Sequence, residues 1–69
     1  MAVSYKKLWI LLIEKNMKKT DLRIQSGIST GALAKLGRNK NVNTEVLAKI
    51  CKTLNCDISD IMEMVPEEV

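Results

Sequence analysis

Residues 19–38 read KTDLRIQSGISTGALAKLGR, and this stretch decides the fold. Residues 20–26 form a predicted helix that begins at Thr20, a residue type favoured at helix N-termini. Gly27 follows, and glycine readily adopts the left-handed conformation that ends a helix. Ser29 can cap a second helix that runs from residue 30 to about residue 36 or 38. The stretch therefore predicts two short helices joined by a tight turn.

The two predicted helices each have an apolar side and a polar side. The apolar positions that would bury their inner sides are Leu22, Ile28, Leu33 and Leu36. Thr30, Lys35 and Arg38 are then free to point outward from the second helix. Two helices of this length around a glycine turn have the geometry of a DNA-binding helix-turn-helix. The major groove of DNA is wide enough to admit the outer side of such a second helix.

Three further helices are predicted around this pair. The first covers residues 4–16, with Ser4 as its N-cap. The fourth begins at Asn43 or Thr44, ends at Leu54 and is the most clearly amphipathic segment. A short last helix begins at Asp57 or Ser59 and ends before Pro66. No stretch alternates with a period of two for long enough to indicate a strand. We therefore expect an all-α fold, a compact five-helix bundle formed by a single domain over residues 1–69.

Composition supports one small domain with an uneven charge. The chain has 69 residues, of which 46% are hydrophobic, and Trp9 and Tyr5 are its only aromatic residues, so the core is predicted to be aliphatic. The net charge is +3. Residues 1–40 contain nine Lys or Arg and two acids, a charge of +7, whereas residues 41–69 contain two Lys and six acids, a charge of −4. The first half can therefore face a polyanion.

Several function classes are excluded by what the sequence lacks. There is no histidine, and one pair of cysteines, Cys51 and Cys56, supplies too few ligands for a structural zinc site. Both cysteines are expected to be small buried hydrophobes in a reducing compartment. No nucleophile–base pair or phosphate loop indicates an enzyme, so we predict no catalytic activity, cofactor, metal or small-molecule substrate. The longest apolar run, residues 8–13, is too short to span a membrane, and a cytoplasmic protein is expected.

Short pieces of the sequence match one known family in order and spacing. They are Leu8 and Leu11, Met17, Thr20-Asp-Leu22, Gly27-Ile-Ser29, Leu33 and Leu36, residues 44–54 (TEVLAKICKTL) and residues 56–61 (CDISDI). Over about residues 5–63, the chain resembles the Cro/C1-type (XRE-like) helix-turn-helix regulators of phages and bacteria. The resemblance implies a lambda-repressor-like DNA-binding domain that binds double-stranded DNA sequence-specifically and regulates transcription.

The resemblance also implies roles for individual residues. Lys19 and Thr20 would contact phosphates from the start of the first motif helix. Ser29, Thr30, Gly31 and Lys35 would face the groove from a recognition helix at about residues 29–37. Among these, Lys35 is the best candidate for guanine and Thr30 for a thymine methyl group. Arg38, Asn39 and Lys40 would hold the DNA backbone beyond that helix.

Three departures from the family pattern bear on which bases are read. Arg23 stands where the family usually has Ala, at the crossing of the two motif helices. Lys19 replaces a Gln that is frequent at the start of the first motif helix. The recognition helix also lacks the Gln and Asn side chains that usually read adenine.

Two questions stay open at the level of sequence. A domain of this size is expected to act as a homodimer on a two-fold site. The candidate dimer surfaces are the acidic, Met-bearing last helix, which we favour, and the wide apolar face of the first helix. The alternative function is a helical protein-interaction module, antitoxin-like or an adaptor, that has the same fold without specific DNA reading.

Overall fold

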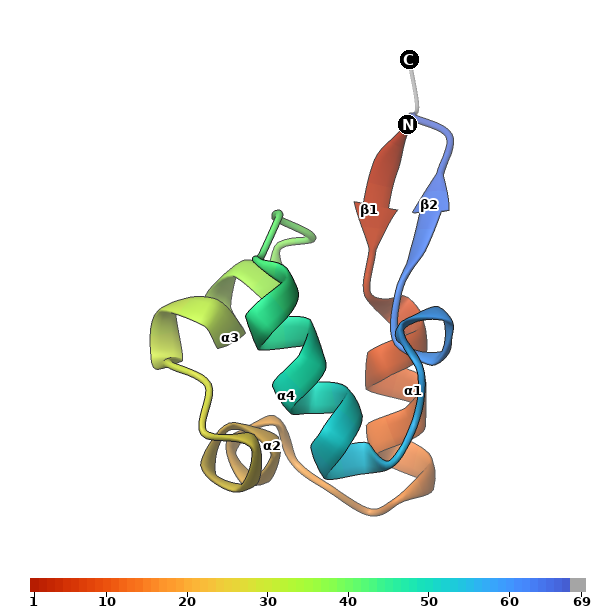
Figure 1. Ribbon diagram of the computed structural model, residues 1–69. Helices are drawn as coiled ribbons and strands as arrows, with labels where there is room; N and C mark the ends of the chain where they lie inside the picture. Colours follow the sequence, from red (N-terminus) through yellow and green to blue (C-terminus); the bar gives the residue numbers. More distant parts are fainter. Residues whose placement is uncertain (68–69) are drawn as a thin grey trace.

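Residues 1–67, the part of the chain that the computed structural model describes, form four α-helices, one short 3-10 turn and a two-stranded sheet (Figure 1). In chain order these are β1 (Ala2–Ser4), α1 (Lys6–Glu14), α2 (Lys19–Ser26), α3 (Thr30–Gly37), α4 (Thr44–Leu54), η1 (Ile58–Asp60) and β2 (Glu63–Val65). Helix α4 runs through the middle of the molecule, and β1 and β2 project together as an arm from the side where α1 and η1 lie.

The prediction of a fifth helix was wrong. After α4 the chain forms only the three-residue turn η1 and then strand β2, so Met64 lies in a strand. Strand β2 pairs antiparallel with β1, with Ala2 opposite Val65 and Val3 opposite Met64. Each strand has three residues, which is too few for a period of two to be visible in the sequence. The pairing also joins the two ends of the domain, and no local pattern can reveal such a contact.

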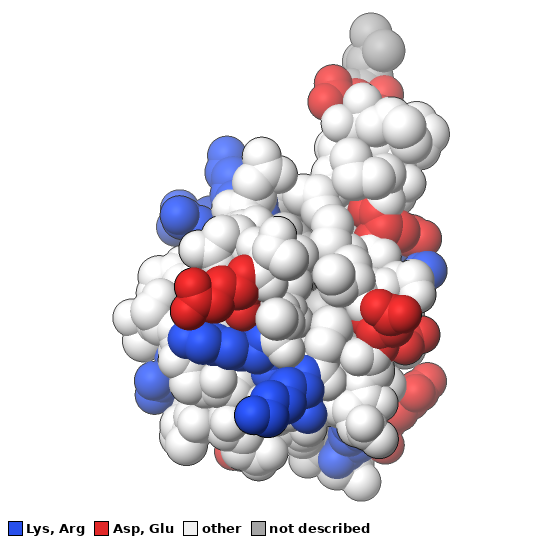
Figure 2. Space-filling model, in the orientation of Figure 1, with Lys and Arg blue, Asp and Glu red and all other residues white. Residues whose placement is uncertain are grey.

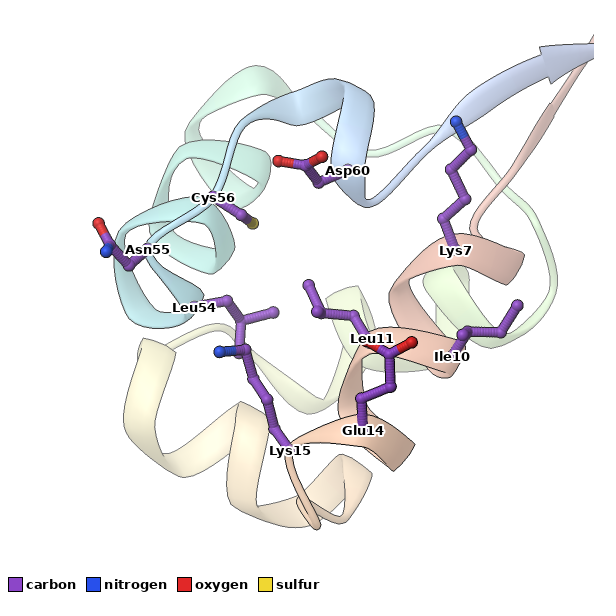
Figure 3. Close-up of a pocket in the computed structure, with 9 residues that line it drawn as sticks. All are labelled: Lys7, Ile10, Leu11, Glu14, Lys15, Leu54, Asn55, Cys56 and Asp60. Carbon is purple, nitrogen blue, oxygen red and sulfur yellow. The ribbon is translucent and has the colours of Figure 1, made fainter.

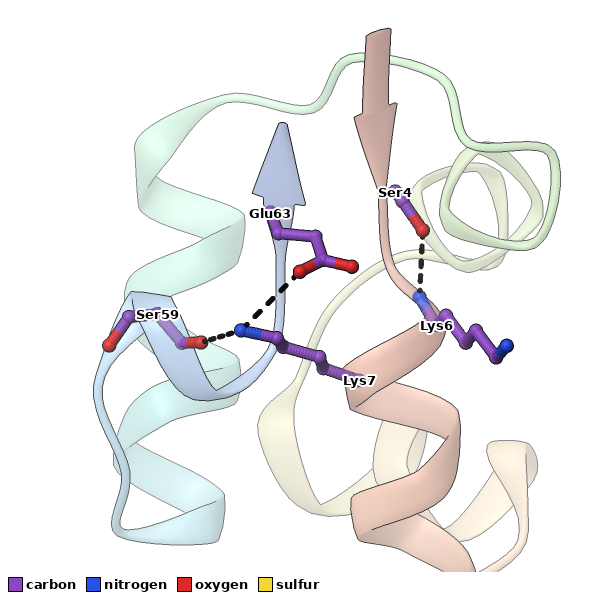
Figure 4. A network of polar contacts seen from close by, with 5 residues as sticks. All are labelled: Ser4, Lys6, Lys7, Ser59 and Glu63. Carbon is purple, nitrogen blue, oxygen red and sulfur yellow. Dashed lines mark hydrogen bonds and ion pairs between the residues drawn. The ribbon is translucent and has the colours of Figure 1, made fainter. Parts of the chain in front are cut away.

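Two predicted helix starts were also wrong. Ser4 belongs to β1, and its hydroxyl oxygen accepts a hydrogen bond from the backbone N–H of Lys6, the first residue of α1 (Figure 4). Helix α2 begins at Lys19 rather than after Thr20, because the Asp21 carboxylate reaches back 3.0 Å to the backbone N–H of Lys18. An acid in the third helical position satisfies an otherwise free N–H in this way.

The other predicted caps are confirmed. Gly27 ends α2 in the left-handed conformation, with φ of 77°. The Ser29 hydroxyl accepts a hydrogen bond from the Ala32 N–H at the start of α3, and the Asn43 side chain accepts one from the Val46 N–H at the start of α4. Asp57 caps η1 through the N–H of Ile58. The Ser29, Asn43 and Asp57 side chains each satisfy a backbone donor that the helix itself leaves free.

The core is aliphatic, as predicted, apart from one aromatic residue, Tyr5. The buried hydrophobic side chains are Val3, Tyr5, Leu8, Leu12, Leu22, Ile28, Leu36, Leu47, Ile50, Leu54 and Ile61. They come from β1, from all four α-helices and from three residues between elements, Tyr5, Ile28 and Ile61, so one cluster holds the domain together. Burying a side chain of this size contributes roughly 1.5–3 kcal/mol.

Lys7 fastens the C-terminal segment to α1. Its ammonium donates to the backbone carbonyl of Ser59 at 3.3 Å and pairs with the Glu63 carboxylate at 3.5 Å (Figure 4). Both members of the ion pair are nearly half exposed, so its own contribution to stability is small. Its effect is geometric, because η1 and β2 are both tied to the first turn of α1.

Within residues 1–67, no helix has the length and apolar character needed to cross a membrane.

Candidate nucleic-acid interface

Helices α2 and α3 form the helix-turn-helix that the sequence predicts. Gly27 provides the left-handed residue between them, and Ile28 inserts into the core with 4% of its surface exposed. Leu22 of α2 and Leu36 of α3 are completely buried. Because the inner side of each helix is thus occupied by the core, the outer sides are left for solvent or a ligand.

All nine residues predicted to contact DNA are exposed. They come from the first turn of α2, from α3 and from the loop that follows α3: Lys19, Thr20, Ser29, Thr30, Gly31, Lys35, Arg38, Asn39 and Lys40. Ser29, Gly31 and Lys35 line one shallow groove of about 240 Å³ between α3 and the start of α4. The prediction therefore selected an accessible set of side chains on neighbouring elements.

Two of the nine side chains already make hydrogen bonds within the protein. The Ser29 oxygen accepts from Ala32 N–H at 3.0 Å, and the Asn39 oxygen accepts from Tyr5 N–H at 3.1 Å. The Ser29 hydroxyl hydrogen and the Asn39 NH₂ group are the donors that these bonds leave for another partner. Both residues therefore have a structural role that the sequence analysis assigned only to Ser29.

Residues that line or support this surface were also missed by the sequence analysis. Asn43, which caps α4, and Val42 complete the groove beside α3. Trp9 of α1 lies under the ammonium of Lys19, with the Lys19 Nζ 4.3 Å from the centroid of its ring. A cap residue such as Asn43 can be found from sequence, but its position beside α3 depends on how the helices pack.

The charge on the molecule is segregated as the sequence indicates. Figure 2 shows Lys and Arg side chains along the left edge, on the side where α2 and α3 lie, and in the lower middle of this face, where α4 runs and an acidic side chain lies beside them. Most acidic side chains lie on the right, by η1 and the arm. Among the described residues, the ion pairs are Met1–Glu67, Lys7–Glu63 and Lys49–Glu45, so Lys19, Lys35, Arg38 and Lys40 keep their charges available.

The two cysteines lie near the end of α4, Cys51 within the helix and Cys56 just after it. Both are free thiols and are partly buried. Burial, followed by the neighbouring Cys56, raises the pKa of Cys51 to about 11. Burial likewise raises the pKa of Cys56. Within residues 1–67, no three His, Cys, Asp or Glu side chains are grouped so that they could hold a metal ion.

The buried inner sides, the glycine turn and the exposed basic outer surface define a DNA-binding helix-turn-helix domain. The model of the Cro/C1-type HTH DNA-binding domain matches residues 7–67, and the chain belongs to this family. The crystal structure of the transcriptional regulator VanUg (Form II) superposes with a TM-score of 0.92 at 55% sequence identity, covering 96% of this chain and 88% of that one. Among curated proteins, no sequence matches this chain.

Proposed function

We propose that this protein is a transcriptional regulator that binds a specific double-stranded DNA sequence, with α3 as the recognition helix in the major groove. The observation that carries the proposal is the exposed polar side of α3, with Ser29 at its start, Thr30 and Lys35 on it, and basic residues in the loop that follows. The family to which the chain belongs is a DNA-binding one, and VanUg is described as a transcriptional regulator.

Under this proposal the exposed residues divide into two groups. Lys19 and Thr20, and beyond α3 the segment of Arg38, Asn39 and Lys40, contact phosphates and set the position of the domain on the duplex. Within α3, Lys35 donates to guanine O6 and N7, and Thr30 contacts a thymine methyl group. Ser29 and Gly31 allow the start of α3 to approach the bases closely.

We further propose that the protein binds as a homodimer through α1. The last helix, our favoured surface from the sequence, does not exist, because that segment forms η1 and β2. On α1, Ile10 is 46% exposed at a groove of about 360 Å³ that α1 forms with the end of α4 and with η1 (Figure 3). Leu11 and Leu54 point into this groove.

A second copy of the chain fits this groove because the groove carries charges of both signs. Lys15 and Glu14 lie on its α1 side, and Asp60 lies across from them (Figure 3). In a two-fold interface the same patch faces itself, so a basic group of one copy can meet an acid of the other.

Sedimentation equilibrium tests α1 as the dimer surface. Ile10→Lys should give monomers, whereas Ile24→Lys, which changes an isoleucine 63% exposed on α2, should stay dimeric. Equal behaviour of the two variants would reject α1 as the dimer surface.

Selection of bound fragments from sheared genomic DNA, repeated at several salt concentrations, tests the proposed function. One recovered motif with two half-sites about one helical turn apart, roughly 34 Å, would support a dimeric, specific regulator. Equal, salt-sensitive recovery of all fragments would indicate contact with the DNA backbone only. No recovery at low salt would reject DNA binding and favour the protein-interaction module.

A further inference from the structure

Tyr5 joins the start of α1 to the loop that follows α3. It is 1% exposed, and its hydroxyl donates a hydrogen bond to the backbone carbonyl of Lys40 at 2.8 Å. Its backbone N–H donates to the side-chain oxygen of Asn39 at 3.1 Å. One residue thus fixes two successive positions of a loop that is more than thirty residues away in the sequence.

The loop needs such support because it buries little of its own surface. Residues 37–41 are all exposed, and Val42 is the first partly buried side chain after α3. The end of α3 is closed by hydrogen bonds from Lys40 N–H to the Lys35 carbonyl and from Asn39 N–H to the Leu36 carbonyl. These bonds hold the backbone turn, but segments with few buried apolar contacts open easily.

Asn39 has two roles: it adopts the left-handed conformation after α3, and its side chain accepts a hydrogen bond from Tyr5. The other helix ends show that the first role does not require the second. Asn16 and Asn55 end α1 and α4 in the same left-handed conformation, with φ of 55° and 53° against 55° for Asn39. Within residues 1–67, only the Asn39 side chain among these three accepts a hydrogen bond from another element. The left-handed turn therefore forms without this bond, and the Asn39 amide serves the link to Tyr5.

We propose that Tyr5 is a positioning residue for DNA binding, which holds the loop so that Arg38 and Lys40 meet the phosphates beyond the recognition helix. The inference rests on the proposed function. Arg38 and Lys40 flank Asn39, and the two hydrogen bonds from Tyr5 fix the backbone of this segment before DNA arrives. A loop ordered in advance loses less conformational entropy on binding than one that must be ordered by the DNA. Asn39 then has a second role besides its proposed phosphate contact, because its side-chain oxygen links the loop to Tyr5.

Two variants remove the two links separately. Tyr5→Phe keeps the buried ring and removes only the hydroxyl that bonds to Lys40. Asn39→Gly keeps a residue that tolerates positive φ and removes the oxygen that accepts from Tyr5 N–H. Thr53→Val is the matched control, because it removes a side-chain hydrogen bond to a backbone carbonyl, that of Lys49, on α4.

The experiment measures amide hydrogen exchange of the free protein and binding to a random-sequence duplex across salt concentrations. We expect Tyr5→Phe and Asn39→Gly each to speed exchange at residues 40–42. Each should weaken binding about fivefold and lower the salt slope by about one phosphate contact, whereas Thr53→Val should do neither. Asn39 is itself a proposed phosphate contact, so Tyr5→Phe, which alters no side chain that would face DNA, is the variant that decides the matter.

Two results would overturn the inference, and they can be told apart. If exchange at residues 40–42 accelerates while affinity and salt slope stay at the wild-type values, the loop is held by Tyr5 but does not contact DNA. In that case the proposed function stands, because the wild-type protein binds. If the wild-type protein itself does not bind the duplex at low salt, the proposed function fails and the inference fails with it.

Discussion

The ammonium of Lys19 lies over the indole ring of Trp9, with Nζ 4.3 Å from the ring centroid. Lys19 is the first residue of α2, and Trp9 lies on α1, so the contact joins the first helix to the start of the helix-turn-helix. An exposed cation–π pair of this kind contributes about 0.5–1 kcal/mol. The contact with Trp9 also holds the positive charge of Lys19 at the N-terminal end of α2, which is the end at which the helix dipole favours a bound anion.

Lys19→Ala should weaken binding to target and random DNA by the same factor. A side chain at this position is proposed to contact phosphate, and phosphate contacts carry no sequence information. The salt slope of binding should fall by about one, because one fewer counterion is released. Fluorescence anisotropy of a labelled duplex, titrated at several salt concentrations, measures both quantities.

Lys52→Ala is the control for net charge, because Lys52 is an exposed basic residue on α4, outside the motif. It should leave the salt slope unchanged. A slope lowered equally by both variants would mean that overall charge, rather than a contact at Lys19, governs binding.

Lys35→Ala should weaken binding to the target more than to random DNA. Lys35 is exposed in the last turn of α3 and lines the groove beside that helix. Loss of a base contact of this type reduces discrimination by about 1–3 kcal/mol. Competition between target and random duplexes measures the difference directly. Lys40→Ala, a change in the following loop, should reduce both affinities alike, and the same pattern for Lys35→Ala would remove its proposed role in reading bases.

The parts of the fold that the sequence predicts correctly are those controlled by local interactions. Ser29, Gly27 and Asn43 act on backbone groups within four residues, so their effect is visible in a short window of sequence. The parts that it misses depend on contacts between distant residues. Val3 opposes Met64 across the arm, and neither residue carries a local signal for a strand.

In the candidate site, too, the sequence predicts what depends on local spacing and misses what depends on contacts between distant residues. Lys35 and Arg38 could be predicted to be exposed, because the spacing of Leu33 and Leu36 fixes which side of α3 is buried. The structural role of Asn39 could not be predicted, since its partner is the backbone of Tyr5, which is reached only when β1 and α1 are packed beside the loop. The bond from Tyr5 to Lys40 has the same origin.

Removing the cap of α3 or of α4 should cost the same stability but affect DNA binding differently. Ser29→Ala and Asn43→Ala each delete the side-chain oxygen that accepts from a backbone N–H, so each should lower the free energy of unfolding by about 1 kcal/mol. Urea denaturation followed by circular dichroism measures this loss. Similar loss in both variants would confirm that the Ser29 oxygen acts as a cap.

Ser29→Asp separates capping from DNA contact. Aspartate caps a helix as well as serine does, and its charge suits the N-terminus, so stability should be retained. The same charge would face the phosphates or bases at the start of α3, so DNA affinity should fall at least tenfold, as an order-of-magnitude expectation from one buried like-charge contact. Wild-type affinity in Ser29→Asp would mean that the start of α3 does not face DNA.

Cys51 should react slowly in the folded protein. Burial, followed by the nearby Cys56, raises the pKa of its thiol from 9.0 to about 11. The thiolate is the reactive form, so at pH 8 modification by a disulfide reagent should be about 100-fold slower in the folded chain than in urea. Single-cysteine variants, Cys56→Ala and Cys51→Ala, assign the measured rate to each thiol, and a Cys51 that reacts equally fast when folded would contradict the prediction.

The raised pKa of Cys51 also predicts how stability depends on pH. Because the folded state favours the protonated thiol, its contribution is complete below the unfolded pKa of 9.0 and is lost as the pH rises toward about 11. Denaturation between pH 8 and 11 should show a smaller decline for Cys51→Ala than for the wild-type protein. Burial raises the pKa of Tyr5 and of Cys56 as well, and both are present in the two proteins, so the difference between the curves reports the Cys51 thiol together with its effect on Cys56. Parallel curves would show that Cys51 titrates alike in the folded and unfolded chains.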